Sequence, residues 1–241
     1  MEEFKNKKIL ITGGAHGIGL ELVKSFANIC SEVIFIDKDR VKGKKIQNYP
    51  NSKKNIYFYY CDLSNFKNSM SIFRKVLKKH KNINFLINNA KSGERYEVLK
   101  ESEKNWDQSM NVILKNSFFF SQEFIKNNNN KKTFTSILNI SSIVTKMVSK
   151  ESPSYHAAKS GLEGITKYLA AHAGKYNVRI NAILPGFIIQ KRHHKKFFSK
   201  RNSKYRNSAF DLHPMRNVGT EDDIIKVAIF LLSSNSKFVN G

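Results

Sequence analysis

The sequence is poor in cysteine and in long apolar runs. Cys30 and Cys61 are too few for a disulfide framework, and no Cys/His cluster has the spacing of metal ligands, so we expect no metal site. No apolar run approaches the roughly 18 residues that span a bilayer. The N-terminus, MEEFKNKKIL, lacks the longer hydrophobic region and the cleavage site of a secretory signal. These absences predict a soluble, cytoplasmic protein without a membrane segment.

Acidic side chains are scarce as well. The chain has 42 Lys and Arg against 19 Asp and Glu, a net charge of +23, which raises nucleic acids, anionic membranes and acidic proteins as partners. The cations are spread along the chain among abundant Asn and Ile, and no helix-turn-helix, zinc-finger or RNA-binding aromatic signature accompanies them. We therefore disfavour nucleic acid as a partner. A nucleic-acid-binding side activity is the weakest alternative, for which a steep salt dependence would be required.

Apolar segments with the character of strands alternate with segments of helical period. We expect strands at residues 7–12, 32–37, 55–62, 83–90, 134–142 and 178–186, and helices at 18–29, 66–80, 101–126, 155–176 and 221–232, with a short helix after residue 37. The strands are apolar enough to be covered on both faces. The alternation predicts an α/β fold, a doubly wound parallel sheet of Rossmann type in a three-layer αβα arrangement. We expect a single domain over residues 1–241, with ligands at the carboxyl ends of the strands.

Two stretches fall outside this alternation. Residues 127–132, NNNNKK, are expected to form a solvated loop, and residues 187–218 lack a clear pattern. An unstructured segment of that length is usually a functional lid or a mobile insertion. It contains KRHHKKFFSKRNSKYR, whose cations could attract a phosphate, a carboxylate, a coenzyme A thioester or an acyl carrier protein, although a solvated basic loop fits equally well. We expect a small-molecule substrate, anionic compounds included.

The first strand runs into a glycine-rich turn. ILITGGAHGIGLELVKSFA contains T-G-x-x-x-G-x-G between a strand and an amphipathic helix. Glycine at Gly13, Gly17 and Gly19 permits a tight turn and lets backbone N–H groups approach a pyrophosphate. A generic strand–helix turn is the alternative interpretation. The pattern favours a dinucleotide site.

Asp37 ends the second expected strand, about twenty residues after the glycines, where a carboxylate can accept hydrogen bonds from a ribose 2′-hydroxyl. A 2′-phosphate would be repelled there, so we expect NAD rather than NADP. Lys38 and Arg40 could partly offset this repulsion. The alternative is that Asp37 caps the next helix.

Six segments, in this order, resemble the short-chain dehydrogenase/reductase family: TGGAHGIG, CDLS, NNA, NISS, YHAAK and PG. Each is weak alone, but their order and spacing are specific and extend over nearly the whole chain. The resemblance implies an NAD(P)-dependent oxidoreductase acting on CH–OH or C=O groups. It also implies further cofactor contacts, at His16 and Ile18 in the glycine turn, Asp62 and Leu63 at the adenine, Asn89 in the cleft, and Pro185, Gly186 and Ile188 at the nicotinamide.

The spacing Y-x-x-x-K occurs three times, at Tyr49/Lys53, Tyr96/Lys100 and Tyr155/Lys159. Pro50 interrupts the first pair, and the second has no serine-bearing strand end at the family's spacing before it. Tyr155 and Lys159 open an expected helix and share one of its faces, and Ser142 ends the expected strand thirteen residues earlier. The resemblance places its catalytic serine there. Only this third pair has a complete setting.

The chemistry explains these residue types. Hydride transfer to a carbonyl carbon requires a proton at the oxygen, and alcohol oxidation requires its removal. A free tyrosine, with a pKa of about 10, is a poor base near neutrality, and a neighbouring ammonium lowers that pKa. Tyr155 would therefore be the acid/base, Lys159 would supply the charge, and Ser142 would donate a hydrogen bond to the substrate oxygen. The resemblance also implies that Tyr155 and Lys159 contact the cofactor, Lys159 through the nicotinamide ribose. A surface Tyr, a solvated Lys and a strand-capping Ser are the alternatives.

The sequence departs from the family pattern in several places. Ile113 stands where an asparagine supports the proton relay, and we hypothesise that Asn116, at i+3, replaces it. Lys91 replaces the glycine after NNA, and Gln190 stands where a threonine often reaches the nicotinamide amide. Relatives continue into one more strand after SKFVNG, so we expect that the sequence is incomplete or that a sheet edge is left unpaired, and we favour the first.

The expected helix at 101–126 carries aromatic residues on several sides: Phe118, Phe119, Phe120 and Phe124. Such a helix needs cover on several sides. We expect a homodimer or homotetramer, with a wholly intramolecular aromatic core as the alternative.

The leading function is an NAD-dependent alcohol dehydrogenase or ketone reductase that acts on a small molecule. A close variant is a 3-oxoacyl-thioester (acyl carrier protein) reductase, which a basic lid would suit. A different class is a nucleotide-binding protein with weak catalysis, which Ile113, Lys91 and the missing strand would favour.

Overall fold

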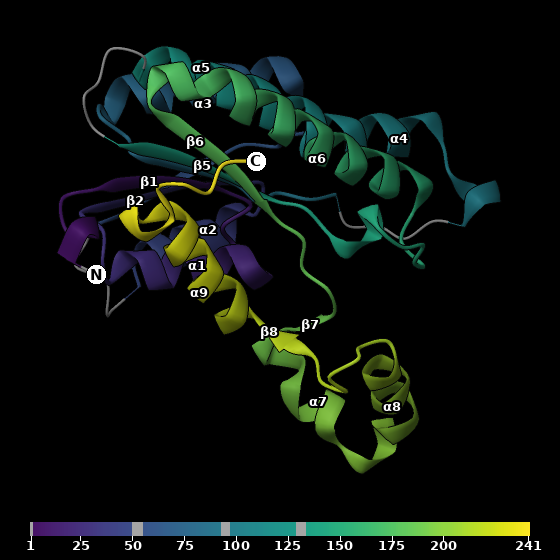
Figure 1. Cartoon of the computed structure of the whole chain (residues 1–241). Helices are drawn as coiled ribbons and strands as arrows, with labels where there is room; N and C mark the ends of the chain where they lie inside the picture. The colour runs from purple at the N-terminus through teal and green to yellow at the C-terminus, as the bar shows by residue number, and fades with distance from the viewer. Residues whose placement is uncertain (1, 50–54, 93–96, 129–133) are drawn as a thin grey trace.

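A parallel sheet of six strands forms the centre of the protein in this computed structural model (Figure 1), which describes residues 2–49, 55–92, 97–128 and 134–241. The strands are β1 (Lys8–Thr12), β2 (Glu32–Asp37), β3 (Ile56–Tyr60), β4 (Phe85–Asn88), β5 (Thr135–Ile140) and β6 (Val178–Ile183). Their order is β3-β2-β1-β4-β5-β6, so the winding direction reverses between β1 and β4. The predicted doubly wound sheet is confirmed, and the reversal is where such sheets bind ligands.

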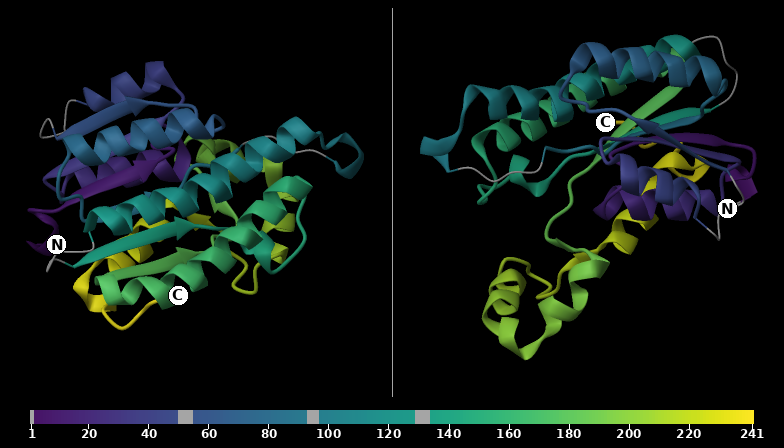
Figure 2. Two further views of the ribbon diagram at one scale, coloured as in Figure 1. Left: turned by 90° about the horizontal axis from the view of Figure 1, so that it is seen from above. Right: turned by 180° about the vertical axis from the view of Figure 1, so that it is seen from behind.

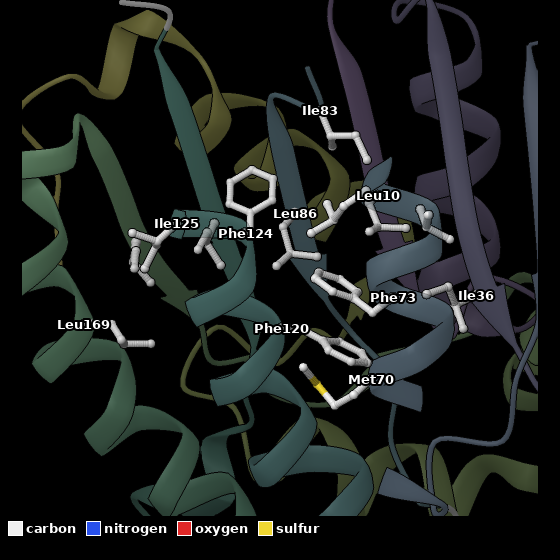
Figure 3. Close-up of a cluster of buried hydrophobic side chains, with 14 of the residues drawn as sticks. Leu10, Ile36, Met70, Phe73, Ile83, Leu86, Phe120, Phe124, Ile125 and Leu169 are labelled. Carbon is white, nitrogen blue, oxygen red and sulfur yellow. The ribbon is translucent and has the colours of Figure 1, made fainter. Parts of the chain in front are cut away.

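Helices cover both faces of the sheet (Figure 1). One layer contains α1 (Gly17–Ala27), α2 (Arg40–Gln47) and α9 (Glu221–Leu232), and the other contains α3 (Phe66–Lys79), α4 (Glu103–Ser109), α5 (Asn116–Asn128) and α6 (Pro153–Ala173). Two apolar cores result, one on each face. Figure 3 shows the core under α3 and α5, where the rings of Phe73 and Phe120 stack with centroids 4.1 Å apart. Burying one such side chain contributes about 1.5–3 kcal/mol.

The helix expected at 101–126 forms and contains one irregular turn. Between α4 and α5 the backbone forms a π-helical turn, Met110–Lys115, in which the N–H of Asn116 donates to the carbonyl of Asn111. The side chain of Asn116 also donates to the carbonyl of Leu63 at 2.7 Å, which ties this turn to the segment after β3. The chain is helical from Glu103 to Asn128 with the π-helical turn inside it, so the expected helix is confirmed and the irregular turn is the part that the sequence did not predict.

Residues 187–218 are folded, contrary to the expectation of an unstructured segment. They contain α7 (His194–Phe198) and α8 (Ser203–Asp211), and the short strands β7 (Ile188–Ile189) and β8 (Gly219–Thr220) pair at the base. A small apolar core holds this lid together, made of Phe187, Ile189, Phe197, Ala209, Phe210 and Val218. Figure 1 and the right-hand view of Figure 2 show the lid standing away from the body of the protein.

In the part of the chain that the structure describes, no helix has both the length and the apolar character needed to cross a membrane. The same residues contain no group of three or more His, Cys, Asp or Glu side chains that could hold a metal ion. Part of the expected loop at 127–132 lies outside the described residues, and Asn127 and Asn128 end α5.

Candidate active site

The turn between β1 and α1 leaves no room for side chains at its glycines. Gly13 has a φ of 71°, and a Cβ there would lie 2.8 Å from the Cα of Ala90. A Cβ on Gly19 would collide with the carbonyl oxygen of Gly13. Gly17 begins α1, and Ile18 packs at the edge of the core on that face. Glycine is thus required here by backbone packing, which also creates the cradle that a pyrophosphate needs.

The glycine turn is tied to the end of β4. The hydroxyl of Thr12 accepts hydrogen bonds from the backbone N–H of Asn89 at 3.0 Å and of Ala90 at 3.1 Å. The amide of Asn89 donates to the carbonyls of Thr12 at 3.0 Å and Gly13 at 3.1 Å. Asn89 therefore lies at the reversal point of the sheet, and both of its amide hydrogens are used to hold the turn.

Asp37 ends β2 beside the same turn and is 8% exposed. One carboxylate oxygen accepts from the N–H of Ala15 at 2.9 Å, and the other accepts from the N–H of Asp39 at 2.9 Å. Asp39, not Asp37, caps α2, because its side chain accepts from the N–H of Lys42. The alternative interpretation of Asp37 as a helix cap is therefore wrong. A carboxylate has about four acceptor positions, so Asp37 retains capacity for a ribose hydroxyl.

His16 connects the glycine turn to the start of α2. Its Nε2 lies 3.0 Å from a carboxylate oxygen of Asp39, and its Nδ1 lies 3.1 Å from Nζ of Lys42. The hydrogen bond from the backbone of Lys42, followed by the one from His16, holds the pKa of Asp39 below its usual value. His16 is exposed at the edge of the expected cofactor site.

Asp62 and Leu63 follow β3, the strand next to β2 at the edge of the sheet. A carboxylate oxygen of Asp62 accepts from the N–H of Ser64 at 2.9 Å, which fixes the turn, and Leu63 is 6% exposed. The carbonyl of Leu63 is held by Asn116.

Asn116 does not take the role that the sequence suggested. Its amide donates to the carbonyls of Leu63 and Asn111, each at 2.7 Å, and its oxygen accepts from the hydroxyl of Ser69 at 2.5 Å. These contacts face α3, and Asn116 is 1% exposed, so nothing remains for a proton relay towards Lys159. The hypothesis that Asn116 replaces the asparagine missing at Ile113 was wrong.

The first two turns of α6 carry Tyr155 and Lys159. The helix begins with Ser152, whose hydroxyl accepts from the N–H of Tyr155 at 3.2 Å, followed by Pro153. Nζ of Lys159 lies 5.6 Å from the ring centroid of Tyr155 and donates to the carbonyl of Ile140 at the end of β5. The structure therefore brings this pair together at the carboxyl edge of the sheet.

Lys159 is 2% exposed, and burial lowers its pKa to about 7, with the positive charge of Lys91 as the second cause. A buried ammonium loses hydration, and a nearby cation adds repulsion. Near neutral pH the charge of Lys159 thus responds to small changes in its surroundings.

Ser142 lies two residues beyond β5 and caps a 3-10 turn, Ile143–Thr145, accepting from the N–H of Val144 at 3.4 Å. Its neighbour Ser141 donates to the carbonyl of Lys159 at 3.3 Å. This hydrogen bond joins the segment after β5 to α6. Ser142 therefore directly follows a residue that contacts the backbone of Lys159.

Pro185, Gly186 and Ile188 connect β6 to the lid. The carbonyl of Pro185 accepts from the N–H of Ile143 at 3.0 Å, beside Ser142. Ile188 pairs with Gly219 in the β7–β8 base. The expected nicotinamide end is thus also the stem of the lid.

Gln190 lies over the glycine turn. A Cβ on Gly17 would lie 3.0 Å from Nε2 of Gln190, and Oε1 of Gln190 is buried without a hydrogen-bond partner among the described residues. Lys191 holds this segment down, since its N–H donates to the carboxylate of Glu221 at 3.1 Å. The carboxamide therefore has an unused acceptor at the cradle.

A chain of hydroxyl groups beside Tyr155 was not predicted. Ser154 donates to a carboxylate oxygen of Glu101 at 2.9 Å, its hydroxyl oxygen lies 3.0 Å from that of Ser109, and the hydroxyl oxygen of Ser109 lies 2.7 Å from that of Ser92. It joins residues from four separate segments. No local pattern marks such serines, so the sequence held no signal for them.

Each of the two rival Tyr/Lys pairs has one member outside the described residues. Lys53 and Tyr96 lie outside the described residues, whereas Tyr49 is 39% exposed after α2 and Lys100 ends a short 3-10 turn.

Comparisons with known proteins agree with this architecture. A family model described as Enoyl-(Acyl carrier protein) reductase matches residues 13–241. The probable galactose dehydrogenase of Rhizobium meliloti is 29% identical over 97% of this chain and 91% of its own length. The 3-oxoacyl-[acyl-carrier-protein] reductase of Chlamydia pneumoniae is 29% identical over 97% of this chain and 92% of its own length. Among solved structures, ElxO with NADP bound gives a TM-score of 0.85 at 27% identity, covering 98% of this chain and 94% of that one. With this sheet order and this series of motifs, the chain belongs to the short-chain dehydrogenase/reductase family of oxidoreductases.

Proposed function

We propose that the protein transfers a hydride between NAD(H) and the alcohol or carbonyl group of a small molecule, with Tyr155 as the acid/base. The observation that carries this proposal is the buried ammonium of Lys159, 5.6 Å from the ring of Tyr155 at the carboxyl end of β5. Among the described residues Lys159 has no carboxylate partner; a buried lysine in that setting is costly, and such groups concentrate at functional sites.

The residues present fit a dinucleotide. The cradle at Gly13 and Gly17, which a side chain would fill, matches a pyrophosphate, and the free acceptor of Gln190 lies against it. Asp37 retains acceptor capacity for ribose hydroxyls and would repel a 2′-phosphate, which supports NAD. ElxO was solved with NADP, so the choice between the two needs a direct measurement.

Bound nicotinamide would supply or accept the hydride. In reduction, the hydroxyl of Tyr155 gives its proton to the substrate oxygen, and in oxidation the phenolate takes that proton back. Ser142 donates a hydrogen bond to the same oxygen and stabilises its developing charge. The ammonium of Lys159 favours the phenolate and would hold the nicotinamide ribose of a bound cofactor.

The acyl-thioester variant has support of its own. The relative from Chlamydia pneumoniae is named a 3-oxoacyl-[acyl-carrier-protein] reductase, and residues 191–210 of the lid contain no acidic side chain. Turnover of a 3-oxoacyl thioester with NADPH, but not of simple ketones with NADH, would favour this variant.

A nucleotide-binding protein with weak catalysis is the second candidate. Ile113 is 1% exposed within the apolar core, its carbonyl is taken by the hydroxyl of Ser117 at 2.6 Å, and Asn116 is occupied elsewhere. A proton relay through this helix therefore lacks its usual group.

We also propose a homodimer or homotetramer. Phe120 and Phe124 are covered within the chain, whereas Phe118 and Phe119 are only partly buried on α5. Light scattering coupled to size exclusion measures the mass directly, and a monomer at micromolar concentration would overturn this proposal.

The decisive experiment is fluorescence titration of the full chain with NADH and NADPH, followed by a screen of carbonyls and alcohols. We expect NADH to bind more tightly than NADPH. If neither nucleotide bound, the oxidoreductase proposal would fail. Binding without turnover of any compound would select the second candidate.

A further inference from the structure

Lys91 lies between Ala90 and Ser92, and hydrogen bonds hold these two residues to different parts of the protein. On one side, the backbone N–H of Ala90 donates to the hydroxyl of Thr12 at 3.1 Å, and its Cα lies 2.8 Å from the place of a Gly13 Cβ. Lys91 therefore follows directly from the glycine turn, and its own side chain is exposed.

On the other side, Ser92 is linked to the start of α6. Its hydroxyl lies 2.7 Å from that of Ser109, which in turn lies 3.0 Å from the hydroxyl of Ser154. Ser154 directly precedes Tyr155 and is anchored on Glu101. The backbone of Lys91 is thus held between the cofactor cradle and the residue expected to carry the proton.

Among the described residues, the environment of the Lys91 side chain contains no carboxylate at ion-pair distance. Its charge is nevertheless close enough to Lys159 to contribute to the lowered pKa of that buried amine. Two cations on one side of a site favour an anion between or beside them.

We propose that Lys91 binds an anionic group of the substrate, a carboxylate or a phosphate, so that the substrates are carbonyl or alcohol compounds carrying such a group. This inference rests on the proposed oxidoreductase function and specifies its substrate class. The cofactor diphosphate is the other source of an anion. We favour the substrate because the backbone of Ala90, rather than Lys91, contacts Gly13, and because Ser92 links this segment to Tyr155.

An anion at Lys91 also acts on the acid/base pair. It offsets the repulsion between Lys91 and Lys159, so Lys159 holds its proton to a higher pH. A charged Lys159 is the form that favours the phenolate of Tyr155. Binding of the correct substrate would therefore activate the site, whereas a neutral analogue would not.

The test compares a panel of short 3-oxo and 2-oxo acids with their methyl esters, bound to the NADH-saturated full chain and followed by NADH fluorescence. The variants are Lys91→Met, which removes the charge, and Lys91→Arg, which keeps it. Lys175→Met, an exposed lysine at the far end of α6, is the control. We expect wild type, Lys91→Arg and the control to prefer at least one acid over its ester by about fivefold, and Lys91→Met to lose that preference.

A second readout separates ligand binding from a structural effect. With any compound that turns over, the limb of the pH–rate profile that reports Lys159 should move to higher pH in Lys91→Met, because a repelling cation has been removed.

Two results would overturn the proposal: no acid preference in wild type, or a preference that survives in Lys91→Met. A loss of NADH affinity in Lys91→Met, with the acid preference unchanged, would assign Lys91 to the cofactor diphosphate instead. If wild type failed to bind NADH at all, the proposed function itself would have failed, which is a distinguishable outcome.

Discussion

The glycine turn and the lid are attached to the body of the protein in different ways. Thr12, Asn89 and Asp37 connect the turn to three strands through buried backbone hydrogen bonds. The lid has its own apolar core and joins the body through β7, β8 and the exposed ion pairs of Lys191 with Glu21 and Asp222. The difference indicates a rigid cofactor side and a separable substrate side.

The largest effect on activity should come from Tyr155, which lies between the glycine turn and the lid in the proposed active site. Tyr155→Phe should lower kcat by about 10²–10⁴-fold, because the general acid/base is lost, while the Kd for NADH stays within about twofold. Stopped-flow or steady-state assays and fluorescence titration measure the two quantities. Tyr168→Phe, an exposed tyrosine on the same helix, is the matched control. Full activity of Tyr155→Phe would remove Tyr155 from the mechanism.

Lys159→Met should increase the free energy of unfolding of the protein. The folded-state pKa of Lys159 is about 7 against an ordinary value of 10.5, so the unfolded chain binds more protons between these values and wild type gains stability as pH rises through this window. The variant should therefore gain most at pH 6, on the order of 3 kcal/mol, and little above pH 10. Urea denaturation at both pH values measures this.

Lys167→Met, which is exposed on the same helix, serves as the control for that comparison and should show no such pH dependence. An equal gain for Lys159→Met at pH 6 and pH 10 would mean that the charge of Lys159 is not the cause.

Asp37→Asn should change cofactor preference by about tenfold towards NADPH, because the repulsion of a 2′-phosphate is removed while the hydrogen bonds are partly kept. The ratio of the Kd values for NADH and NADPH measures the change. Asp39→Asn, at the cap of α2, should change neither that ratio nor the stability appreciably, because Asn caps a helix about as well as Asp. Equal effects of the two variants on the ratio would contradict the role of Asp37.

The smallest effect should come from the lid. Lys191→Met removes the exposed ion pairs to Glu21 and Asp222, at 3.3 and 3.1 Å, so the KM of a substrate should rise about threefold with the Tm nearly unchanged. Limited proteolysis should cut the lid faster than in wild type. Lys5→Met, which breaks a surface pair with Glu2, is the control. A large loss of Tm would show that the lid is not separable.

Sequence patterns predicted the rigid side better than the lid. The strands are short runs of apolar residues, and the glycine turn has local steric causes, so both can be recognised from neighbouring letters. The lid helices are dominated by charge, and Phe197 and Ala209 find each other only after folding. Asn116 was misjudged because its partner, Leu63, lies 53 residues away. The serine chain from Ser92 to Ser154 likewise depends on contacts that periodicity does not contain.

The π-helical turn at Met110–Lys115 acts as a one-residue insertion. In an α-helix each residue turns the chain by about 100°, so removing one residue here would rotate Trp106 on α4 relative to Phe120 and Phe124 on α5 by that amount. The extra residue therefore sets which side chains of α4 face the start of α6 beside Tyr155 and which side chains of α5 face the sheet. Comparisons of this chain with its relatives along this helix should therefore count residues separately on either side of the turn.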